Sequence, residues 1–440
     1  MTIYVVGHKN PDTDSIGSAV GYAWLLRERD GVSAVAARAG SINAQSRFAL
    51  DYFGVPAPVL LEDAAPRFAS VARHIEPLSP DTPLYAAWQL SAKEQRAAPI
   101  VDADGRPVGL VTGQSVFAYL SQRLDMTYAV FGKLINVPCG EACERDVPRF
   151  PATDRISDHR EVAIRDQRDD FWVVDGEGRY VGICKRADML RPPHLKLVLV
   201  DHNEASQAVN GLAEAELLEV LDHHRIGTIS TTMPINFHVD VVGSCATLVS
   251  ERMRIARLTP TPEIAGMLLS GILSDTLLFN SPTTTPRDRA SAMWLAWHAF
   301  GVEGAEQKLQ EFGEALLRAG ADISGRSAED IVRADLKEFE AGATRFGISQ
   351  VEVTNFATIY HRMPEIRQAL QHLQEQRSLH FAALMITDIV ENNSLLVCTG
   401  EPRYLERMPF SRKGQGVWEM PGVVSRKKQL LPTLLGVLQG

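Results

Sequence analysis

No stretch of the sequence is apolar for long enough to cross a membrane, since a spanning helix needs about 20 consecutive apolar residues. The pattern of a secretory signal peptide is also missing, and residues 3–6 already read as a first strand that leaves no room for a leader. We therefore expect a cytoplasmic protein without a membrane partner.

Cysteine is scarce, and none of the cysteines forms a C-x-x-C pair. The five are Cys139, Cys143, Cys184, Cys245 and Cys398. Cys139 and Cys143 are too isolated from histidines to suggest zinc. We expect reduced structural thiols, as is usual for a cytoplasmic protein.

An excess of positive charge is missing too, because the formal net charge is −9. Binding to nucleic acid depends on cations that neutralise phosphates, so this charge argues against nucleic acid as the main partner. It leaves room for a small anion at a locally positive site. The 440 residues are long for one hydrophobic core, which predicts two or three domains.

The loop of residues 7–16 is the first segment with functional chemistry. It lies between an apolar strand, residues 3–6, and a predicted helix over 15–29 that Gly31 would end. His8, Asp12 and Asp14 would thus lie at the carboxyl end of a strand, where open α/β sheets bind ligands. Two interpretations stay open: a metal site, or a solvated loop with Asp14 or Ser15 as the helix N-cap.

Two later strands end in the same way. Residues 195–200 precede Asp201-His202-Asn203, and residues 217–221 precede Asp222-His223-His224. A parallel sheet would bring these ends to one crevice, together with Asp275 from an otherwise apolar helix over 262–278. Imidazole and carboxylate ligands favour Mn²⁺, Co²⁺, Fe²⁺ or Zn²⁺. So many ligands indicate two metals, a centre that suits phosphoryl displacement.

Residues 73–190 contain a weak internal repeat of two β-hairpins, over 96–112 and 171–185. The repeat resembles a tandem pair of CBS domains, a module that often binds adenine nucleotides. Such motifs end in Thr/Ser-x-x-Asp, but here the first copy has Thr112 with Ser115, and the second has Lys185 with Asp188. Thr112, Lys185 and Asp188 are therefore candidate nucleotide contacts, and a purely structural, dimerising pair is the alternative.

Five motifs together resemble the family II inorganic pyrophosphatases of the DHH phosphoesterase superfamily, in the CBS-containing branch that nucleotides regulate. They are His8-Lys9-Asn10-Pro11-Asp12-Thr13-Asp14-Ser15, Asp201-His202-Asn203, Asp222-His223-His224, Ser274-Asp275-Thr276 and Ser425-Arg426-Lys427-Lys428-Gln429. The resemblance covers essentially the whole chain.

The resemblance implies residue roles. One metal would be held by His8, Asp12 and Asp201. The other would be held by Asp14, Asp201, His223 and Asp275, with Asp201 bridging. Pyrophosphate would be bound by His224, Lys337, Arg426 and Lys427. His202 and Asp222 would orient ligands without binding metal themselves. The family prefers Mn²⁺ or Co²⁺ in the paired site and uses Mg²⁺ with the substrate.

The expected fold is α/β. A DHH-type parallel-sheet domain (1–70 and 192–305) is interrupted by the tandem CBS insert (71–191). A linker or hinge (306–325) then leads to a smaller mixed α/β domain of DHHA2 type (326–440). In that last domain we expect helices over 328–339 and 364–375, and strands over 346–353, 380–388 and 394–398.

Three other functions are possible on the sequence alone. An oligonucleotide or cyclic-dinucleotide phosphodiesterase of the same superfamily would share the aspartates and the His-His pair, but such enzymes typically carry a glycine-rich segment ending in His near the C-terminus, which this sequence lacks. An exopolyphosphatase is more similar, but its family usually departs from the Asp-His-His motif and lacks the Ser-Arg-Lys-Lys-Gln segment. A non-catalytic adenylate sensor would not need six metal ligands in one crevice. We expect a homodimer in which AMP or ADP inhibits and ATP is neutral or activating.

Overall fold

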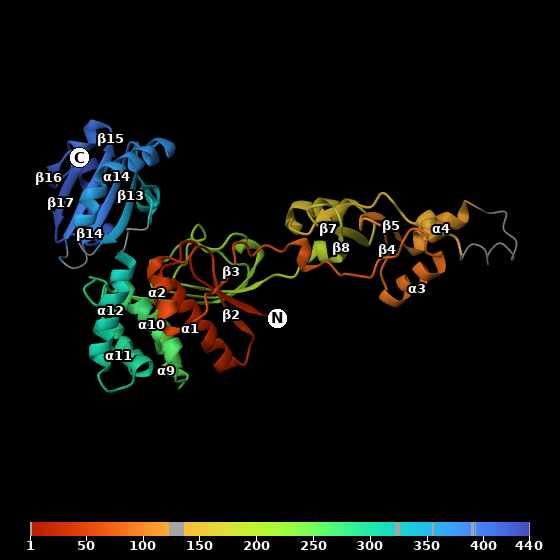
Figure 1. Ribbon diagram of the computed structural model, residues 1–440, viewed down its shortest axis with the longest axis horizontal. Coiled ribbons are helices and arrows are strands. Elements are labelled where there is room, and N and C mark those ends of the chain that lie inside the picture. The colour runs from red at the N-terminus through yellow and green to blue at the C-terminus, as the bar shows by residue number, and fades with distance from the viewer. Residues whose placement is uncertain are drawn as a thin grey trace. The chain divides into compact units, whose positions relative to one another are not determined.

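The computed structural model describes residues 2–122, 136–321, 326–353, 356–388, 391 and 393–439 (Figure 1). The chain divides into two compact units. One unit contains residues 1–62, 196–209 and 217–440, and the other contains residues 63–195 and 210–216. We call residues 63–195 the insert. Among the described helices, none combines the length and hydropathy that a membrane span requires.

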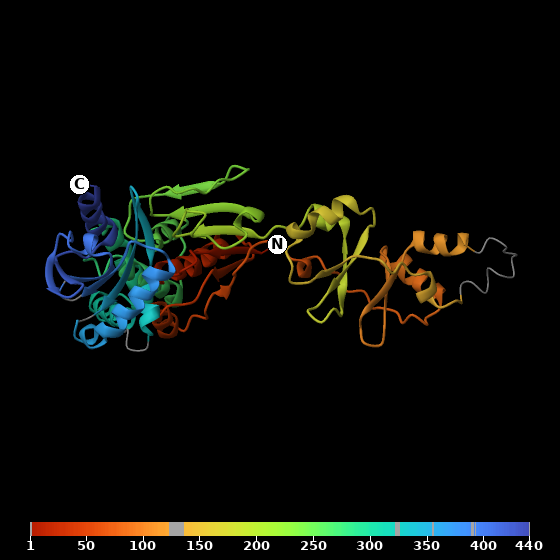
Figure 2. The ribbon, with the colours of Figure 1, turned by 90° about the horizontal axis from the view of Figure 1, so that it is seen from above.

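The first sheet has the strand order β11-β10-β9-β1-β2-β3, and β1 pairs in parallel with both β2 and β9. Figure 1 labels its strands β2 and β3, and Figure 2 shows the same ribbon seen from above. Its strands are β1 (Ile3–Val6), β2 (Ala34–Arg38), β3 (Val59–Leu60), β9 (Lys196–Val200), β10 (Glu216–Asp222) and β11 (Asn236–Val239). The strands β10, β9 and β1 are neighbours, so the chain segments that follow them leave the sheet at one edge.

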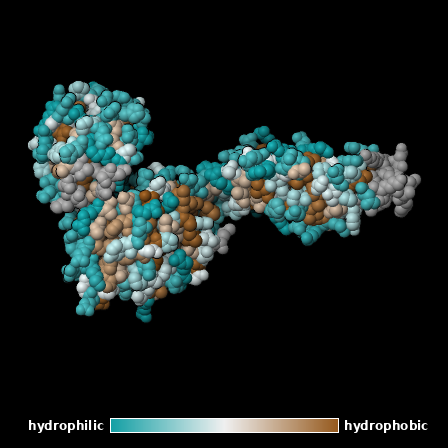
Figure 3. Space-filling view, in the orientation of Figure 1, coloured by the Kyte–Doolittle hydropathy of each residue, from teal (hydrophilic) through white to brown (hydrophobic). Residues whose placement is uncertain are grey.

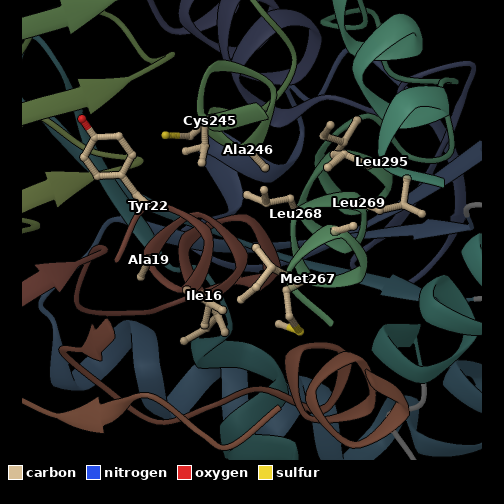
Figure 4. Close-up of a cluster of buried hydrophobic side chains, with 14 of the residues drawn as sticks. Ile16, Ala19, Tyr22, Cys245, Ala246, Met267, Leu268, Leu269 and Leu295 are labelled. Atoms are coloured by element: carbon tan, nitrogen blue, oxygen red, sulfur yellow. The ribbon is translucent and has the colours of Figure 1, made fainter. Parts of the chain in front are cut away.

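Helices cover this sheet. They are α1 (Thr13–Asp30), α2 (Ala44–Phe53), α9 (Cys245–Ile255), α10 (Pro262–Asp275), α11 (Pro286–Phe300) and α12 (Ala305–Ala321). Figure 4 shows apolar side chains of α1, α9, α10 and α11 packed together, with Ile16 near Met267. A Cβ on Gly17 would lie 2.4 Å from the Met267 carbonyl oxygen, so only glycine allows α1 and α10 to approach this closely.

The start of α1 differs from both N-caps considered above. Asp12 is the N-cap, because its carboxylate accepts a hydrogen bond from the Ser15 amide at 2.9 Å. Asp14 lies inside the first turn and is fully buried. The helix ends as predicted at Gly31, whose φ of 64° closes it.

The predicted linker over 306–325 is wrong for residues 306–321. These residues belong to α12, and its apolar face, including Leu309, Phe312 and Leu316, packs in the core beside α2 and α11. The polar residues that suggested a linker form the exposed face of an amphipathic helix. Residues 322–325 lie outside the described part of the chain.

The C-terminal domain (326–439) has a second, mixed sheet in the order β12-β13-β14-β15-β17-β16. Its elements are α13 (Ala328–Arg333), β12 (Lys337–Ala341), β13 (Thr344–Val353), α14 (Ala357–Gln376), β14 (Phe381–Asp388), β15 (Asn393–Gly400), α15 (Pro402–Leu405), β16 (Ser411–Gly414), β17 (Val417–Pro421), a π-helical turn (Arg426–Leu430) and α16 (Leu431–Gln439). Most of its visible face is hydrophilic (Figure 3).

The predicted helix over 328–339 is wrong in its second half. The helix α13 ends at Arg333, Asp335 adopts a positive φ of 43°, and Lys337 begins strand β12. An antiparallel pairing of Lys337–Ala341 with β13 outweighs the helical propensity of this charged segment.

The insert contains two copies of one motif, as the repeat predicts. Both hairpins are antiparallel, β4 with β5 and β7 with β8. In each turn one aspartate, Asp102 or Asp175, accepts two backbone N–H bonds of 2.8 and 3.0 Å. The elements are α3 (Leu84–Glu94), β4 (Ala98–Val101), β5 (Pro107–Val111), α4 (Gly113–Ser121), α6 (Cys139–Ala142), β6 (Arg149–Pro151), α7 (Arg160–Arg165), β7 (Asp170–Val174), β8 (Tyr180–Lys185) and α8 (Arg186–Leu190).

The two copies also exchange short segments. Arg73, which precedes the first hairpin, pairs with Ile183 of the second, and Glu144, between the hairpins, pairs with Leu110 of the first. This reciprocal pairing makes the insert one folded body, and the assignment of the repeat to CBS domains stays a prediction.

Candidate metal centre

Three loops of the first sheet bring imidazoles and carboxylates together. His8 follows β1, Asp201 follows β9 directly, and Asp222 is the last residue of β10. Because these strands are adjacent, their following residues meet at one edge. Among the described residues, three groups have possible ligand atoms within 4.8 Å of one another, and all three include Asp201.

The first group consists of His8, Asp12 and Asp201. His8 Nε2 lies 3.3 Å from Asp12 Oδ2 and 3.4 Å from Asp201 Oδ2. Asp201 is 1% exposed and has a φ of 62°, an uncommon conformation that turns the chain sharply after β9.

The second group consists of Asp14, Asp201, His223 and Asp275. His223 Nε2 lies 3.2 Å from Asp201 Oδ1, 3.8 Å from Asp14 Oδ2 and 3.7 Å from Asp275 Oδ2. Its other ring nitrogen, Nδ1, is 3.2 Å from the carbonyl oxygen of Val242. That contact fixes Nδ1 as the donor and turns Nε2 toward the three carboxylates.

The third group adds Asp222 and His224 to Asp201 and His223. Asp222 is fully buried, and its Oδ1 lies 2.9 Å from His224 Nδ1 and accepts the backbone N–H of His223 at 2.7 Å. Its other oxygen accepts from the Asn203 side chain. Asp222 thereby anchors the His223-His224 turn, and the His224 ring stays partly exposed.

His202 is buried in this loop, 1% exposed. Its Nδ1 lies 2.9 Å from the carbonyl oxygen of Val200, whereas Nε2 has no hydrogen-bond partner among the described residues. Burial lowers the pKa of His202 to about 4, so the ring is neutral at pH 7.

Crowding of carboxylates determines the electrostatics. Burial and the nearby Asp201 charge raise the pKa of Asp14 to about 7. Burial, followed by the charge of Asp14, also raises the pKa of Asp275 well above its usual range. Burial lowers the pKa of His223, but the hydrogen bond to Asp201 and the charges of Asp201 and Asp14 outweigh it and raise the value to about 10. Without a metal, protons therefore offset the charge of the cluster.

These residues fit divalent transition metals. Among the described residues, Asp201 Oδ2 is buried without a hydrogen-bond partner and has only the longer contact of 3.4 Å with His8 Nε2, an arrangement that is costly unless a cation or proton occupies the position. The donor set of imidazole nitrogens and carboxylate oxygens suits Mn²⁺, Co²⁺, Fe²⁺ or Zn²⁺.

The expected pyrophosphate cations of the C-terminal domain form a second cluster, around Asp335. Arg426 is 3% exposed. Its Nη2 donates to Asp335 Oδ2 at 2.6 Å, and Nη1 donates to the carbonyl oxygens of Asp335 and Ile348. Lys337 Nζ lies 3.7 Å from Asp335 Oδ1. Burial and then the Lys337 charge lower the pKa of Lys427.

The resemblance implies that Arg426 binds pyrophosphate, and in this structure its terminal nitrogens contact the protein itself. No described hydrogen bond or ion pair connects this cluster with the six candidate metal ligands. Asp335 is a residue that the sequence analysis missed, because an isolated Asp in a charged segment carries no distinguishing signal.

The candidate nucleotide residues lie at helix starts in the insert. Thr112 caps α4 and its Oγ1 accepts the Ser115 amide at 2.9 Å. Asp188 accepts the Lys185 amide at 3.1 Å and lies 3.9 Å from a nitrogen of Arg96. Arg96 was not predicted, and its Nε is buried without a hydrogen-bond partner in the part of the chain that the structure describes.

Two domain-family models match this chain. The model of the DHH family N-terminal domain matches residues 2–272, and the DHHA2 domain model matches residues 314–437. A cobalt-dependent inorganic pyrophosphatase of Clostridium perfringens (strain 13 / Type A) is 26% identical over 545 positions, covering 99% of this chain and 98% of that protein. Because 545 exceeds the 440 residues here, that relative has segments that this chain lacks.

A manganese-dependent inorganic pyrophosphatase of Bacillus subtilis (strain 168) is 37% identical over 239 residues, which cover 54% of this chain and 75% of the relative. Among solved structures, a Methanococcus jannaschii protein assigned as a family II inorganic pyrophosphatase matches with a TM-score of 0.59 and 26% identity, over 100% of both chains.

Proposed function

The chain belongs to the DHH family, in its family II inorganic pyrophosphatase group, and from this premise we propose that it hydrolyses pyrophosphate to two phosphates at the metal centre. One observation carries the proposal. Asp201 is shared by two groups of ligand atoms, one with His8 and Asp12 and one with Asp14, His223 and Asp275. A carboxylate that belongs to both groups would hold two neighbouring cations at once, as a two-metal site needs them to be close together.

Mn²⁺ or Co²⁺ is the proposed occupant of both positions, and Mg²⁺ would accompany the substrate. Two relatives named above are a cobalt-dependent and a manganese-dependent enzyme. Bound together, such cations supply a hydroxide near neutral pH and neutralise charge on the transferring phosphoryl group. Asp222, through its bonds to the His223-His224 turn, would keep His223 Nε2 directed at the cations.

Pyrophosphate would be bound by His224 next to the metals and by Lys337, Arg426 and Lys427 of the C-terminal domain. The partly exposed His224 ring is accessible to a substrate. Asp335 keeps Arg426 and Lys337 together and would orient them for the phosphate oxygens. Since ligands and cations come from different parts of the chain, we expect the site to be complete only after closure that excludes water.

Regulation by adenine nucleotides is proposed for the insert. Asp188 and Lys185 would contact ribose and phosphate, with Thr112 at the equivalent place in the first copy. The duplicated hairpins and helix caps support a two-fold module of the CBS kind. A homodimer would transmit the effect of AMP, ADP or ATP to the catalytic part.

Phosphate release from pyrophosphate tests the function. The protein is loaded with Mn²⁺ or Co²⁺, supplied with Mg²⁺, and assayed alongside Asp201→Asn. Fast release by the wild type, lost in the variant, supports the proposal. If a long polyphosphate or a dinucleotide is cleaved and pyrophosphate is not, the substrate assignment is wrong and the metal centre remains.

A further inference from the structure

The Asp14 carboxylate, one of the proposed metal ligands, is held by the start of helix α9. Its Oδ1 accepts from Ser244 Oγ at 2.8 Å and from the Ala246 amide at 2.9 Å, and its Oδ2 accepts from the Cys245 amide at 2.6 Å. Ser18 of the same helix as Asp14 adds a fourth bond of 3.0 Å. The position of Asp14 therefore depends on where the segment 244–246 lies.

A second buried carboxylate, Asp288 in the first turn of α11, holds that segment from both sides. The Gly243 amide donates to Asp288 Oδ1 at 3.0 Å and to Oδ2 at 2.9 Å. Thr247 Oγ1 donates to Oδ1 at 2.7 Å. The two donors come directly before and directly after the three residues that bind Asp14.

These contacts exceed what Asp288 needs as part of a helix cap. Within α11, Asp288 forms a capping box with Thr285, whose N–H and Oγ1 both donate to its Oδ2 at 2.7 Å. That box alone would satisfy one oxygen and stabilise α11. The other oxygen, Oδ1, is used entirely for α9, through Gly243 and Thr247.

The approach of Gly243 is close enough to require glycine. A Cβ there would lie 2.9 Å from Asp288 Oδ2 and 2.8 Å from the Thr276 side chain. Thr276 directly follows Asp275, the other aspartate of the second ligand group. Asp288, Gly243 and Thr276, which directly follows α10, thus pack against one another, and both side chains are fully buried.

We propose that Asp288 is a positioning residue for the metal pair: by clamping Gly243 and Thr247 it fixes the start of α9, which fixes Asp14. The inference rests on the proposed metal centre. Its physical basis is that partners which orient a ligand change metal affinity although they do not touch the metal, typically by 10–100-fold.

Two neighbouring threonines provide a matched test. Thr247→Val removes the hydroxyl that donates to Asp288 but leaves the α11 cap intact, and Thr285→Ala weakens the cap but leaves the contacts to α9. Asp288→Asn removes the negative charge of the carboxylate and turns the new side-chain N–H toward an N–H that the carboxylate accepts in the wild type, from Gly243 or Thr285. The full-length wild type and the three variants are titrated with Co²⁺, following its visible absorption bands and the heat of binding, and their Tm values are measured without metal.

We expect about tenfold weaker Co²⁺ binding with altered bands in Asp288→Asn, several-fold weaker binding in Thr247→Val, and less than a twofold change in Thr285→Ala despite a lower Tm. The proposal would be overturned if Thr247→Val bound Co²⁺ as tightly as the wild type, or if Thr247→Val and Thr285→Ala lost the same amount of Co²⁺ affinity. This comparison of the two threonine variants remains decisive even if Asp288→Asn fails to fold. A wild type that binds no Co²⁺ would instead refute the metal centre, and the positioning role with it.

Discussion

Replacement of Asp201 by Asn is the most direct test of the paired site. Asp201 Oδ1 is 3.2 Å from His223 Nε2, and Oδ2 is 3.4 Å from His8 Nε2. The two oxygens of one carboxylate thus face two different ligand groups. An amide of the same shape keeps one acceptor, loses the negative charge and directs an N–H into one of the groups.

The expected loss follows from the charge that is removed. Two unit charges 4 Å apart interact by about 4 kcal/mol at an effective dielectric constant of about 20. A divalent cation near this carboxylate loses at least that much, which corresponds to about 1,000-fold weaker binding. Co²⁺ affinity is measured by calorimetry and by visible absorption, and phosphate release at saturating pyrophosphate is measured in parallel.

Glu219→Gln is the matched control. Glu219 is a buried carboxylate on strand β10, as Asp222 is, but its oxygens bind Tyr22 and Arg252. We expect this variant to lose thermal stability and to keep Co²⁺ affinity. If Asp201→Asn bound Co²⁺ within threefold of the wild type, the shared-carboxylate reasoning would be wrong.

Three further predictions concern protons, substrate and effector. Because the pKa of Asp14 is about 7 and that of His223 about 10, both groups carry protons at pH 6 in the metal-free protein. Co²⁺ must displace these protons, so its affinity should rise from pH 6 to 8, and calorimetry in buffers of different ionisation enthalpy should detect proton release. An affinity that does not change with pH would contradict this prediction. Both pKa values are raised relative to the unfolded chain, so the Tm of metal-free protein should fall over the same range. Asp335→Ala, which frees Arg426, should raise KM for pyrophosphate at least tenfold at unchanged Co²⁺ affinity; an unchanged KM counts against the orienting role. In calorimetry, AMP should bind to the wild type, and it should bind at least tenfold more weakly to Asp188→Asn. If the wild type gives no heat with AMP, ADP or ATP, the insert is a structural element only.

Secondary structure could be predicted from the sequence where it depends on residues close together in the chain. The strand at residues 3–6 and the helix that follows it, ending at Gly31, are present as predicted. Both hairpins of the insert formed because their Asp and Gly turn residues define them. His8, Asp201 and Asp222 could be found as candidate site residues because each lies at or just after the end of an apolar strand.

Segments whose structure depends on distant partners were predicted less well. Charged residues around Lys337 read as helix, but pairing with β13 makes them a strand. Residues 306–321 are rich in polar residues and were therefore predicted as a linker, but they form an amphipathic helix whose apolar face packs in the core. Nothing in the sequence around Arg426 indicates a partner within the chain, and only the fold brings Asp335 next to it.

The sequence by itself determined which chemical groups the chain carries and at which strand ends they lie, because strand alternation and turn residues act over a few positions. Only the tertiary structure decided how those groups are oriented. Asp14 is held by donors some 230 residues away in the chain, and Asp288 acts on it through α9. Such contacts leave no periodic pattern in the sequence, since hydrogen-bond geometry is fixed only once separate helices pack together.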